Sequence, residues 1–177
     1  MTQGRWGINS SQYSAFCTDV DGDRYIEVPA PFPLYSQTSS ANTFGIDWYS
    51  YSAYGQRTLD VSTYHCFLDG WYLELKPEWR EDLTVRRDDS VAGEHTVILS
   101  HVDADTGIVR DFLAVYTLTG ENMRERAEVG GRFVIRDEGS TVYAAKILES
   151  GRGAALRESD VKERFKLIYS EWMTDLL

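Results

Sequence analysis

The chain has 177 residues, and its 28 Asp and Glu against 18 Lys and Arg give a formal net charge of −10. Its length suffices for one domain with a hydrophobic core, and its 42% of hydrophobic residues is typical of a folded globular protein. The negative charge argues against nucleic acid or an anionic membrane as a partner, because both attract a positive surface. It favours instead a protein partner with a basic surface.

The sequence has no apolar run near the roughly 18 residues that a membrane span requires. The first residues lack the basic and then apolar pattern of a signal peptide, so we expect a cytoplasmic protein. Arginine outnumbers lysine by 14 to 4. Such a bias often accompanies GC-rich coding and favours a bacterial or phage origin.

Aromatic and charged residues are divided unequally along the chain. The first 75 residues hold 15 of the 23 aromatic residues but only 11 of the 46 charged ones. Tyr and Trp among Ser and Gly are typical of recognition surfaces, because their rigid rings supply contact area at a low entropic cost. The asymmetry predicts a contact surface in the first part of the chain and a solvated, charged surface in the second.

The first part predicts short strands separated by turns. Arg24 to Val28 has the β-forming residues of a strand. The alternating prolines that follow, Pro29, Pro31 and Pro33, indicate an edge strand or a linker, because proline donates no backbone hydrogen bond. Ile46 to Tyr54 predicts a strand or an ordered contact loop. Leu59 to Leu68 and Gly70 to Leu75 predict a hairpin that turns at Asp69-Gly70.

The second part predicts two more hairpins and a helix. One helical turn is expected at Trp79 to Leu83. The two hairpins pair His95–Val102 with Ile108–Thr119 and Arg132–Arg136 with Thr141–Leu148, since both connecting turns contain glycine. A helix is expected from Ser159 to Met173, because its apolar residues recur at spacings of four, three and four; they are Val161, Phe165, Ile168 and Trp172.

These elements predict an α+β fold: a single domain over residues 1–177, made mainly of an antiparallel β-sheet built of hairpins, with one C-terminal amphipathic helix. A weaker subdivision separates an aromatic-rich β part, residues 1–76, from the hairpins and helix of residues 93–177. Neither half alone has an obviously sufficient core, so the single domain is preferred.

Closely spaced carboxylates stand out near the N-terminus, at Asp19, Asp21, Asp23 and Glu27. Ca²⁺ takes six to eight oxygen ligands, so acids around a glycine suit it. The string departs from an EF-hand loop, because Gly22 stands at position four rather than six and position twelve has no acid. Asp and Gly are also the ordinary residues of tight turns. We therefore predict no cofactor, with Ca²⁺ or Mg²⁺ at these four residues as the alternative.

The same string, Asp19-Val-Asp-Gly, resembles the first motif of haloacid-dehalogenase-like phosphatases. The resemblance implies a nucleophile at Asp19, a general acid at Asp21 and a Mg²⁺ ion. It covers about five residues, and Asp23 stands where that family has Thr or Val. The rest of the chain lacks the alternation of strands and helices that a doubly wound sheet requires.

Cysteine and histidine chemistry is weakly supported. His65 and Cys66 are neighbours on a predicted strand, so their side chains point to opposite faces and cannot act as a pair. The three histidines lack the close spacing of a zinc site. Phosphate-binding and serine-hydrolase motifs are absent from the sequence. The chain therefore favours a non-enzymatic role without excluding an enzyme.

The favoured function is a non-catalytic protein-binding or accessory module with an acidic surface. Its contact face would be formed by Trp48, Tyr49, Tyr51 and Tyr54, and its partner would be another protein or a second copy of the chain in a homodimer. Two alternatives stay open: a divalent-metal-dependent hydrolase or Ca²⁺-binding domain centred on the acidic string, and a carbohydrate-binding module that stacks sugars on the same rings.

Overall fold

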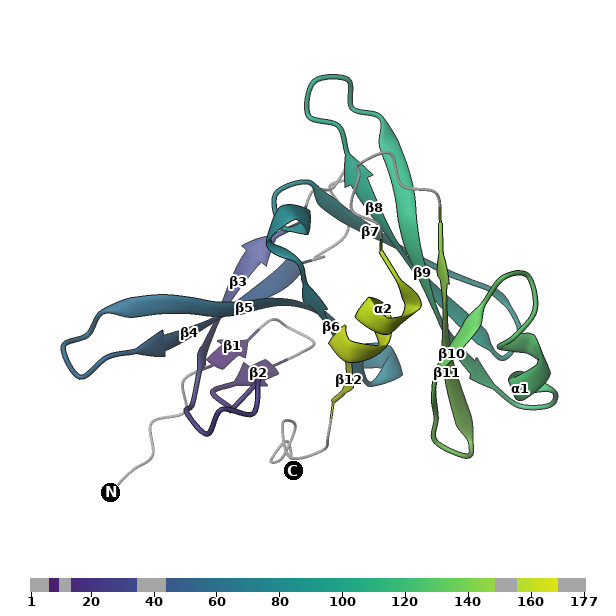
Figure 1. Ribbon diagram of the computed structural model, residues 1–177, viewed down its shortest axis with the longest axis horizontal. Helices are drawn as coiled ribbons and strands as arrows, with labels where there is room; N and C mark the ends of the chain where they lie inside the picture. Colours follow the sequence, from purple (N-terminus) through teal and green to yellow (C-terminus); the bar gives the residue numbers. More distant parts are fainter. Residues whose placement is uncertain (1–6, 10–13, 35–43, 149–155, 169–177) are drawn as a thin grey trace. The chain divides into compact units, whose positions relative to one another are not determined.

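The computed structural model of the chain describes residues 7–9, 14–34, 44–148 and 156–168. These residues form mostly antiparallel β-structure with few helices (Figure 1). Within them, no helix combines the length and the apolar character that crossing a membrane requires. The predicted β-rich, largely antiparallel fold is confirmed.

The chain divides into two compact units. The first contains Met1–Pro33, Phe44–Pro77 and Lys166–Leu177, and the second contains Leu34–Thr43 and Glu78–Phe165. The division after Pro77 falls next to the boundary that the sequence suggests at residue 76. That residues 1–177 fold as one domain stays a prediction.

The first unit contains a small two-stranded sheet and a five-stranded sheet in the order β12-β6-β5-β4-β3. The short strands are β1 (Gly7–Asn9) and β2 (Ser14–Phe16). The strands of the large sheet are β3 (Val28–Pro33), β4 (Phe44–Tyr51), β5 (Arg57–Cys66), β6 (Trp71–Leu75) and β12 (Phe165–Leu167). The 3₁₀ turn η1 (Phe67–Asp69) joins β5 to β6.

Strand β3 confirms the prediction of an edge strand, because it lies at one end of this sheet. Its prolines occupy every second position of the ladder with β4. Alternate residues of an antiparallel strand direct their N–H groups to the same neighbour, so these prolines fit where their nitrogens face the open edge. The strand begins at Val28 rather than at Arg24 as predicted, because Arg24 takes a left-handed backbone conformation (φ 77°) inside a longer turn.

The core of the first unit gathers around Trp48. It contains Ala15, Val20, Ile46 and Tyr72, all buried. The Trp48 side chain is 0% exposed, and its indole N–H donates a hydrogen bond of 2.7 Å to the Thr63 hydroxyl. This hydrogen bond satisfies the indole N–H, which loses its contact with water when the ring is buried.

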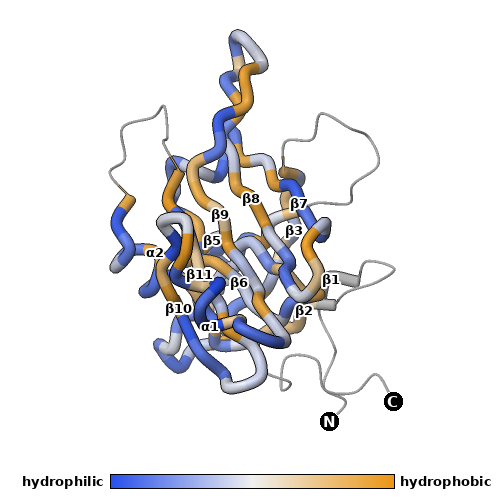
Figure 2. Tube along the Cα trace, turned by 90° about the vertical axis from the view of Figure 1, so that its right-hand side faces the viewer, coloured by the Kyte–Doolittle hydropathy of each residue, from blue (hydrophilic) through white to orange (hydrophobic). Residues whose placement is uncertain are grey.

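The second unit contains a five-stranded sheet in the order β10-β11-β9-β8-β7. Its strands are β7 (Leu83–Val91), β8 (Glu94–Val102), β9 (Val109–Thr119), β10 (Phe133–Asp137) and β11 (Thr141–Ile147). The 3₁₀ turn η2 (Pro77–Trp79) precedes β7, and the helices are α1 (Met123–Arg126) and α2 (Glu158–Arg164). Apolar stretches run along β8 and β9 (Figure 2).

Both faces of this sheet are covered in its middle, since Leu113, Ala114 and Val115 are successive residues of β9 and all are buried. On one face Leu118 packs with Ala127, which directly follows α1. On the other face the Tyr143 ring lies 5.3 Å from the Phe165 ring, centroid to centroid. The hairpins predicted here are confirmed by the antiparallel pairs β8–β9 and β10–β11.

The C-terminal helix is shorter than predicted. Helix α2 ends at Arg164, and the next three residues form strand β12 in the sheet of the first unit. Phe165 already has extended backbone angles (φ −79°, ψ 127°). The predicted end at Met173, and Trp172 in the predicted stripe, lie outside the described residues.

Candidate functional site

The hairpin of β4 and β5 extends past the rest of its sheet (Figure 1). Pairing of β4 with β3 ends at Tyr49, and pairing of β5 with β6 ends at Ser62. From there to the turn, the two strands pair only with each other through Ser50–Thr58 and Tyr51–Arg57. We call residues 49–60 the arm.

The two faces of the arm differ in chemistry. Residues opposite each other in an antiparallel ladder share a face, so Tyr49, Leu59, Tyr51 and Arg57 lie on one side. Ser50 lies on the other side, where its hydroxyl donates a hydrogen bond of 3.2 Å to Asp60. The arm therefore has an aromatic face and a polar face.

Exposure is high along the aromatic face. Tyr51 is 52% exposed, and Leu59 is exposed as well. Tyr49 is half-buried; its hydroxyl donates to Asp47 at 3.2 Å, and the Arg57 guanidinium lies 4.1 Å above its ring. A cation over a ring face is an attractive contact that restricts both side chains. The face is thus exposed to solvent and internally ordered.

Tyr54 stands at the tip of the arm and is 94% exposed. The turn beneath it is held by Ser52, whose N–H donates to the Gln56 carbonyl at 2.9 Å and whose hydroxyl accepts the N–H groups of Gln56 at 3.1 Å and Tyr54 at 3.3 Å. Gly55 takes the left-handed conformation that closes the turn (φ 76°). The ring is presented to solvent from an ordered backbone.

Of the four residues predicted for a contact face, three lie on the arm: Tyr49, Tyr51 and Tyr54. The assignment of Trp48 is wrong, because its ring is fully buried in the core. Sequence reasoning did not include Arg57 and Leu59, which complete the aromatic face. The signal that identifies them is their place opposite Tyr51 and Tyr49, which only the register of the hairpin supplies.

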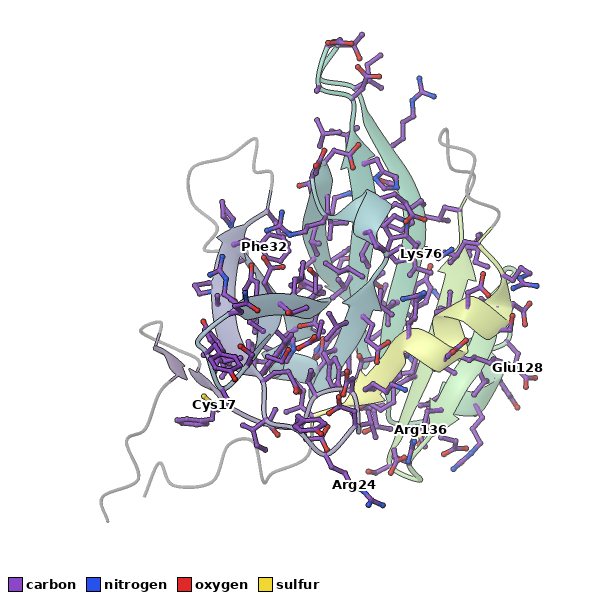
Figure 3. All side chains as sticks on the ribbon, turned by 60° about the vertical axis from the view of Figure 1, so that its left-hand side comes forward. Cys17, Arg24, Phe32, Lys76, Glu128 and Arg136 are labelled. Atoms are coloured by element: carbon purple, nitrogen blue, oxygen red, sulfur yellow. The ribbon has the colours of Figure 1, made fainter. Side chains whose placement is uncertain are left out.

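The acidic string forms a turn between Thr18 and Glu27, which are joined by two backbone hydrogen bonds of 2.9 and 3.2 Å. Asp19 organises this turn, since its two carboxylate oxygens accept the N–H groups of Gly22 at 2.7 Å and Arg24 at 2.9 Å. The Arg24 side chain is exposed and points away from the turn (Figure 3).

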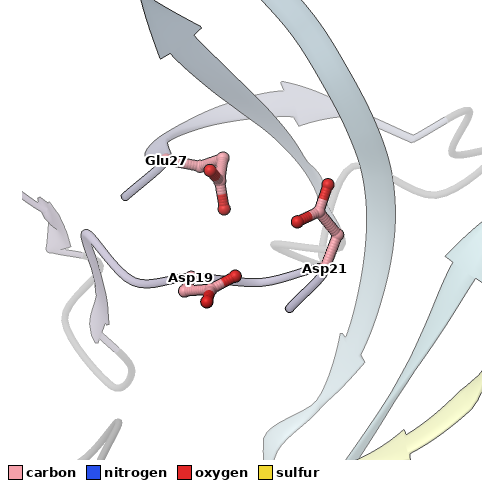
Figure 4. A group of neighbouring side chains, drawn as sticks. All are labelled: Asp19, Asp21 and Glu27. Carbon is pink, nitrogen blue, oxygen red and sulfur yellow. The ribbon is translucent and has the colours of Figure 1, made fainter. Parts of the chain in front are cut away.

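Carboxylate oxygens of Asp19, Asp21 and Glu27 lie within 4.8 Å of one another (Figure 4). Asp23, the fourth predicted ligand, is outside this group, and its Oδ1 accepts the Tyr25 N–H at 2.8 Å. Glu27 is only 1% exposed and accepts the Val20 N–H at 2.8 Å. Burial raises the pKa of Glu27, and the negative charges of the three Asp residues raise it further.

Cys66 and His65 are buried in the first unit and do not form a nucleophile pair. The Cys66 thiol donates to Asp69 at 3.1 Å, and the His65 ring stacks on Tyr72 at 4.9 Å between centroids. Burial lowers the pKa of His65 to about 3, so the ring is neutral at physiological pH. This environment is that of core residues.

No protein-family model matches the chain, and no similarity to a curated protein or to a solved structure is found. The resemblance to haloacid-dehalogenase-like phosphatases gains no support from the fold, because the described sheets are largely antiparallel rather than parallel and doubly wound. The geometry of the site is therefore the basis for a functional proposal.

Proposed function

We propose that this protein is a non-catalytic protein-binding module and that the aromatic face of the arm is its contact surface. The single observation that carries the proposal is the placement of Tyr51 and Tyr54 in solvent on a hairpin that extends past its own sheet. Large rings in that position stabilise no core of the described structure. Burial of these rings by a partner would therefore contribute free energy to binding.

The chemistry of the arm supports a protein partner. Tyrosine rings bury large areas with few rotatable bonds, and they are enriched among the residues that dominate binding energies. The turn below Tyr54 and the cation over Tyr49 restrict the arm before it binds, which reduces the entropy lost on association. The polar face, with Ser50 and Asp60, remains hydrated.

The net charge of −10 favours a partner with a basic surface. Opposite charges on two proteins accelerate their encounter and exclude acidic competitors, while buried rings slow dissociation. We accordingly propose a basic protein as the partner, and a second copy of this chain is the alternative that the experiment distinguishes.

The proposal is tested with the double variant Tyr51→Ser/Tyr54→Ser beside the polar-face variant Thr58→Ala. Proteins captured from a lysate of the source cells are quantified, and the partner is then purified and titrated by calorimetry. We expect the double variant to weaken binding at least about tenfold, because each ring is expected to act as an anchor, and Thr58→Ala to bind normally. Equal binding by all three proteins contradicts the proposal. Sedimentation of the protein alone identifies self-association.

A second candidate function, divalent-cation binding, is favoured by one observation: Glu27 is buried with its carboxylate beside those of Asp19 and Asp21. A bound Ca²⁺ would supply positive charge to a carboxylate whose pKa is raised first by burial and then by repulsion from the three Asp residues. Counted from Asp19, Asp21 and Glu27 stand at positions three and nine, which are ligand positions of an EF-hand loop, whereas Asp23 at position five lies outside the cluster.

Calorimetry and thermal unfolding with Ca²⁺ or Mg²⁺ test this candidate with Glu27→Gln. The amide removes a buried negative charge, so without metal we expect the variant to melt at a higher temperature than the natural protein. With Ca²⁺ the natural protein gains stability and the variant does not. Because Glu27 has a raised pKa, Ca²⁺ affinity falls as the pH is lowered through it. No heat and no thermal shift with either ion contradicts the candidate.

A further inference from the structure

The sheet of the second unit contains a pocket of about 220 Å³ that the arm and the acidic turn do not explain. Strands β7, β8 and β9 supply most of its lining, with Arg132 at one side. The register places Asp88 opposite Thr96 and Thr96 opposite Tyr116, so these side chains lie on one face of the sheet. The pocket is smaller than the sites that hold drug-sized ligands. Its size suits a single side chain or a small molecule.

One wall of the pocket is an ion pair. The two terminal nitrogens of Arg132 donate to the two carboxylate oxygens of Glu94 at 2.7 and 3.0 Å. Glu94 is buried, and the Arg132 guanidinium lies 3.8 Å above the Tyr116 ring. A bidentate pair of this kind is geometrically fixed and its charges cancel. The wall therefore presents ordered groups with no net charge.

Asp88 supplies the net charge of the pocket lining. Its side chain is exposed, and its Oδ1 accepts the Ser90 N–H at 2.9 Å. Hydrogen bonds from the Ser90 side chain and backbone lower the pKa of Asp88, which keeps it ionised at physiological pH. The nearby Arg86, whose positive charge also lowers the pKa of Asp88, forms an ion pair with Asp111. The carboxylate of Asp88 is thus held at the pocket in its charged form.

The rest of the lining is apolar or neutral. Val91 and Ile98 contribute aliphatic surface, and Tyr116 contributes its ring. An apolar floor beside one fixed carboxylate matches a ligand with an alkyl stem and a positive head group. Arg and Lys side chains have this composition, and a carboxylate accepts strong, charge-assisted hydrogen bonds from both.

We propose that this pocket binds an alkylguanidinium or alkylammonium group, with its stem over Ile98 and its head group on Asp88. The source is either a free amine or guanidine of low molecular weight or a basic side chain of a protein. The proposal does not rest on the arm, which belongs to the other unit, so either proposal can fail without the other.

The test is a titration followed by nuclear magnetic resonance on the full chain, with backbone amides and isoleucine methyl groups labelled. The probes are the blocked amino acids N-acetyl-arginine methylamide and N-acetyl-lysine methylamide, with N-acetyl-norleucine methylamide as the uncharged control. We expect saturable shifts at Thr96, Ile98 and Tyr116 with at least one cationic probe, and no saturation with norleucine. No saturable shift at these residues with either cation overturns the proposal.

Two variants separate a built site from general attraction to an acidic protein. Asp88→Asn keeps an oxygen for the Ser90 N–H but removes the charge, and we expect binding to weaken about tenfold or more. Asp89→Asn, at the next residue and outside the pocket lining, removes the same charge and is expected to bind normally. Equal weakening by the two substitutions, or none by Asp88→Asn, contradicts the proposal.

The source of the group is resolved by comparing probes. A short peptide with one central arginine is titrated beside free agmatine, which has the same guanidinium and stem. Tighter binding of the peptide identifies a protein side chain as the occupant, and tighter binding of agmatine identifies a free guanidine. Both results support the proposal that the pocket binds a cationic group. If the peptide, agmatine and the blocked amino acids all fail to bind, the proposal is wrong.

Discussion

Gly45 and Phe32 form a close cross-strand contact in the first unit. The two residues are partners in the β3–β4 ladder, and a Cβ atom added to Gly45 would overlap three atoms of the Phe32 ring. Phe32 is buried, so its ring cannot move aside into solvent without exposing apolar area. Gly45 is therefore required here for close approach rather than for an unusual φ.

We expect Gly45→Ala to destabilise the protein by about 1–3 kcal/mol, because inserting a methyl group into a packed contact displaces the ring. Urea unfolding measures the loss. Adding Phe32→Leu removes the overlapping ring atoms, so the double variant should be more stable than the sum of the single changes predicts. Strictly additive losses of stability would show that contact with the Phe32 ring does not determine which side chain position 45 tolerates.

His65 makes the first unit sensitive to acid. Its folded pKa of about 3 lies below the ordinary value of 6.5, so between these values the unfolded chain binds a proton that the folded chain does not. The stability that the neutral ring supplies is complete above pH 6.5 and is lost as the pH falls toward 3. We expect His65→Phe, which keeps a ring beside Tyr72, to reduce this loss.

Urea unfolding at several pH values across this range measures the effect. The control is His95→Gln, which replaces an exposed histidine in place of the buried one. The same steep slope in His65→Phe as in the natural protein would assign the acid sensitivity to other groups. Glu27, with its raised pKa, has the opposite sign: its ionisation lowers stability as the pH rises.

Residue patterns along the chain predict alternation but not which side is buried. Trp48, Tyr49 and Tyr51 lie on one strand, so the sequence alone separates Trp48 from the two tyrosines by face. It does not say which face meets the core, and the contact prediction included both. A one-residue change of register would have exposed Trp48 instead. In the fold, Trp48 packs with the core residues Val20 and Tyr72, so the face of the strand that bears Trp48 is the buried one.

At the scale of elements, the hairpins with glycine turns were predictable, whereas strand β7 and the end of helix α2 were not. Strand β7 was missed because Arg86 to Asp89 are four charged residues of low β propensity, which are tolerated on an edge strand. Helix α2 was predicted too long because Phe165 to Leu167 fit a helical stripe and also alternate by strand periodicity. Pairing with β6 makes them a strand.

The Arg132–Glu94 pair fixes the loop before β10 to strand β8. Replacing Arg132 with Met leaves a buried carboxylate without its cation, and we expect a loss of about 3–5 kcal/mol in unfolding free energy. Replacing both residues, Arg132→Met/Glu94→Met, removes the stranded charge and should cost less than the single change. Urea unfolding of both single variants and the double variant measures the coupling. A cost below about 1 kcal/mol for Arg132→Met would show that the pair contributes no more to the free energy of unfolding than a surface ion pair does.

At the scale of the whole molecule, the unequal distribution of aromatic and charged residues corresponds to two compact units. The aromatic part supplies both the core around Trp48 and the exposed arm. Composition alone could not tell which aromatic residues are buried and which are exposed. The acidic string was predictable as a cluster, yet only the fold shows that Glu27 joins Asp19 and Asp21 while Asp23 does not. The pocket beside Asp88 could not be predicted from the sequence, because strand β7, which supplies part of its lining, was not expected.

The central claim is that the aromatic face of the arm contacts another protein. The most direct measurement is photo-crosslinking in the source cells with a photoreactive amino acid at position 51 or 54, and at position 58 as the polar-face control. The account predicts one discrete adduct from positions 51 and 54 and none from position 58. No discrete adduct from 51 or 54, or the same adduct in equal yield from position 58, would contradict it.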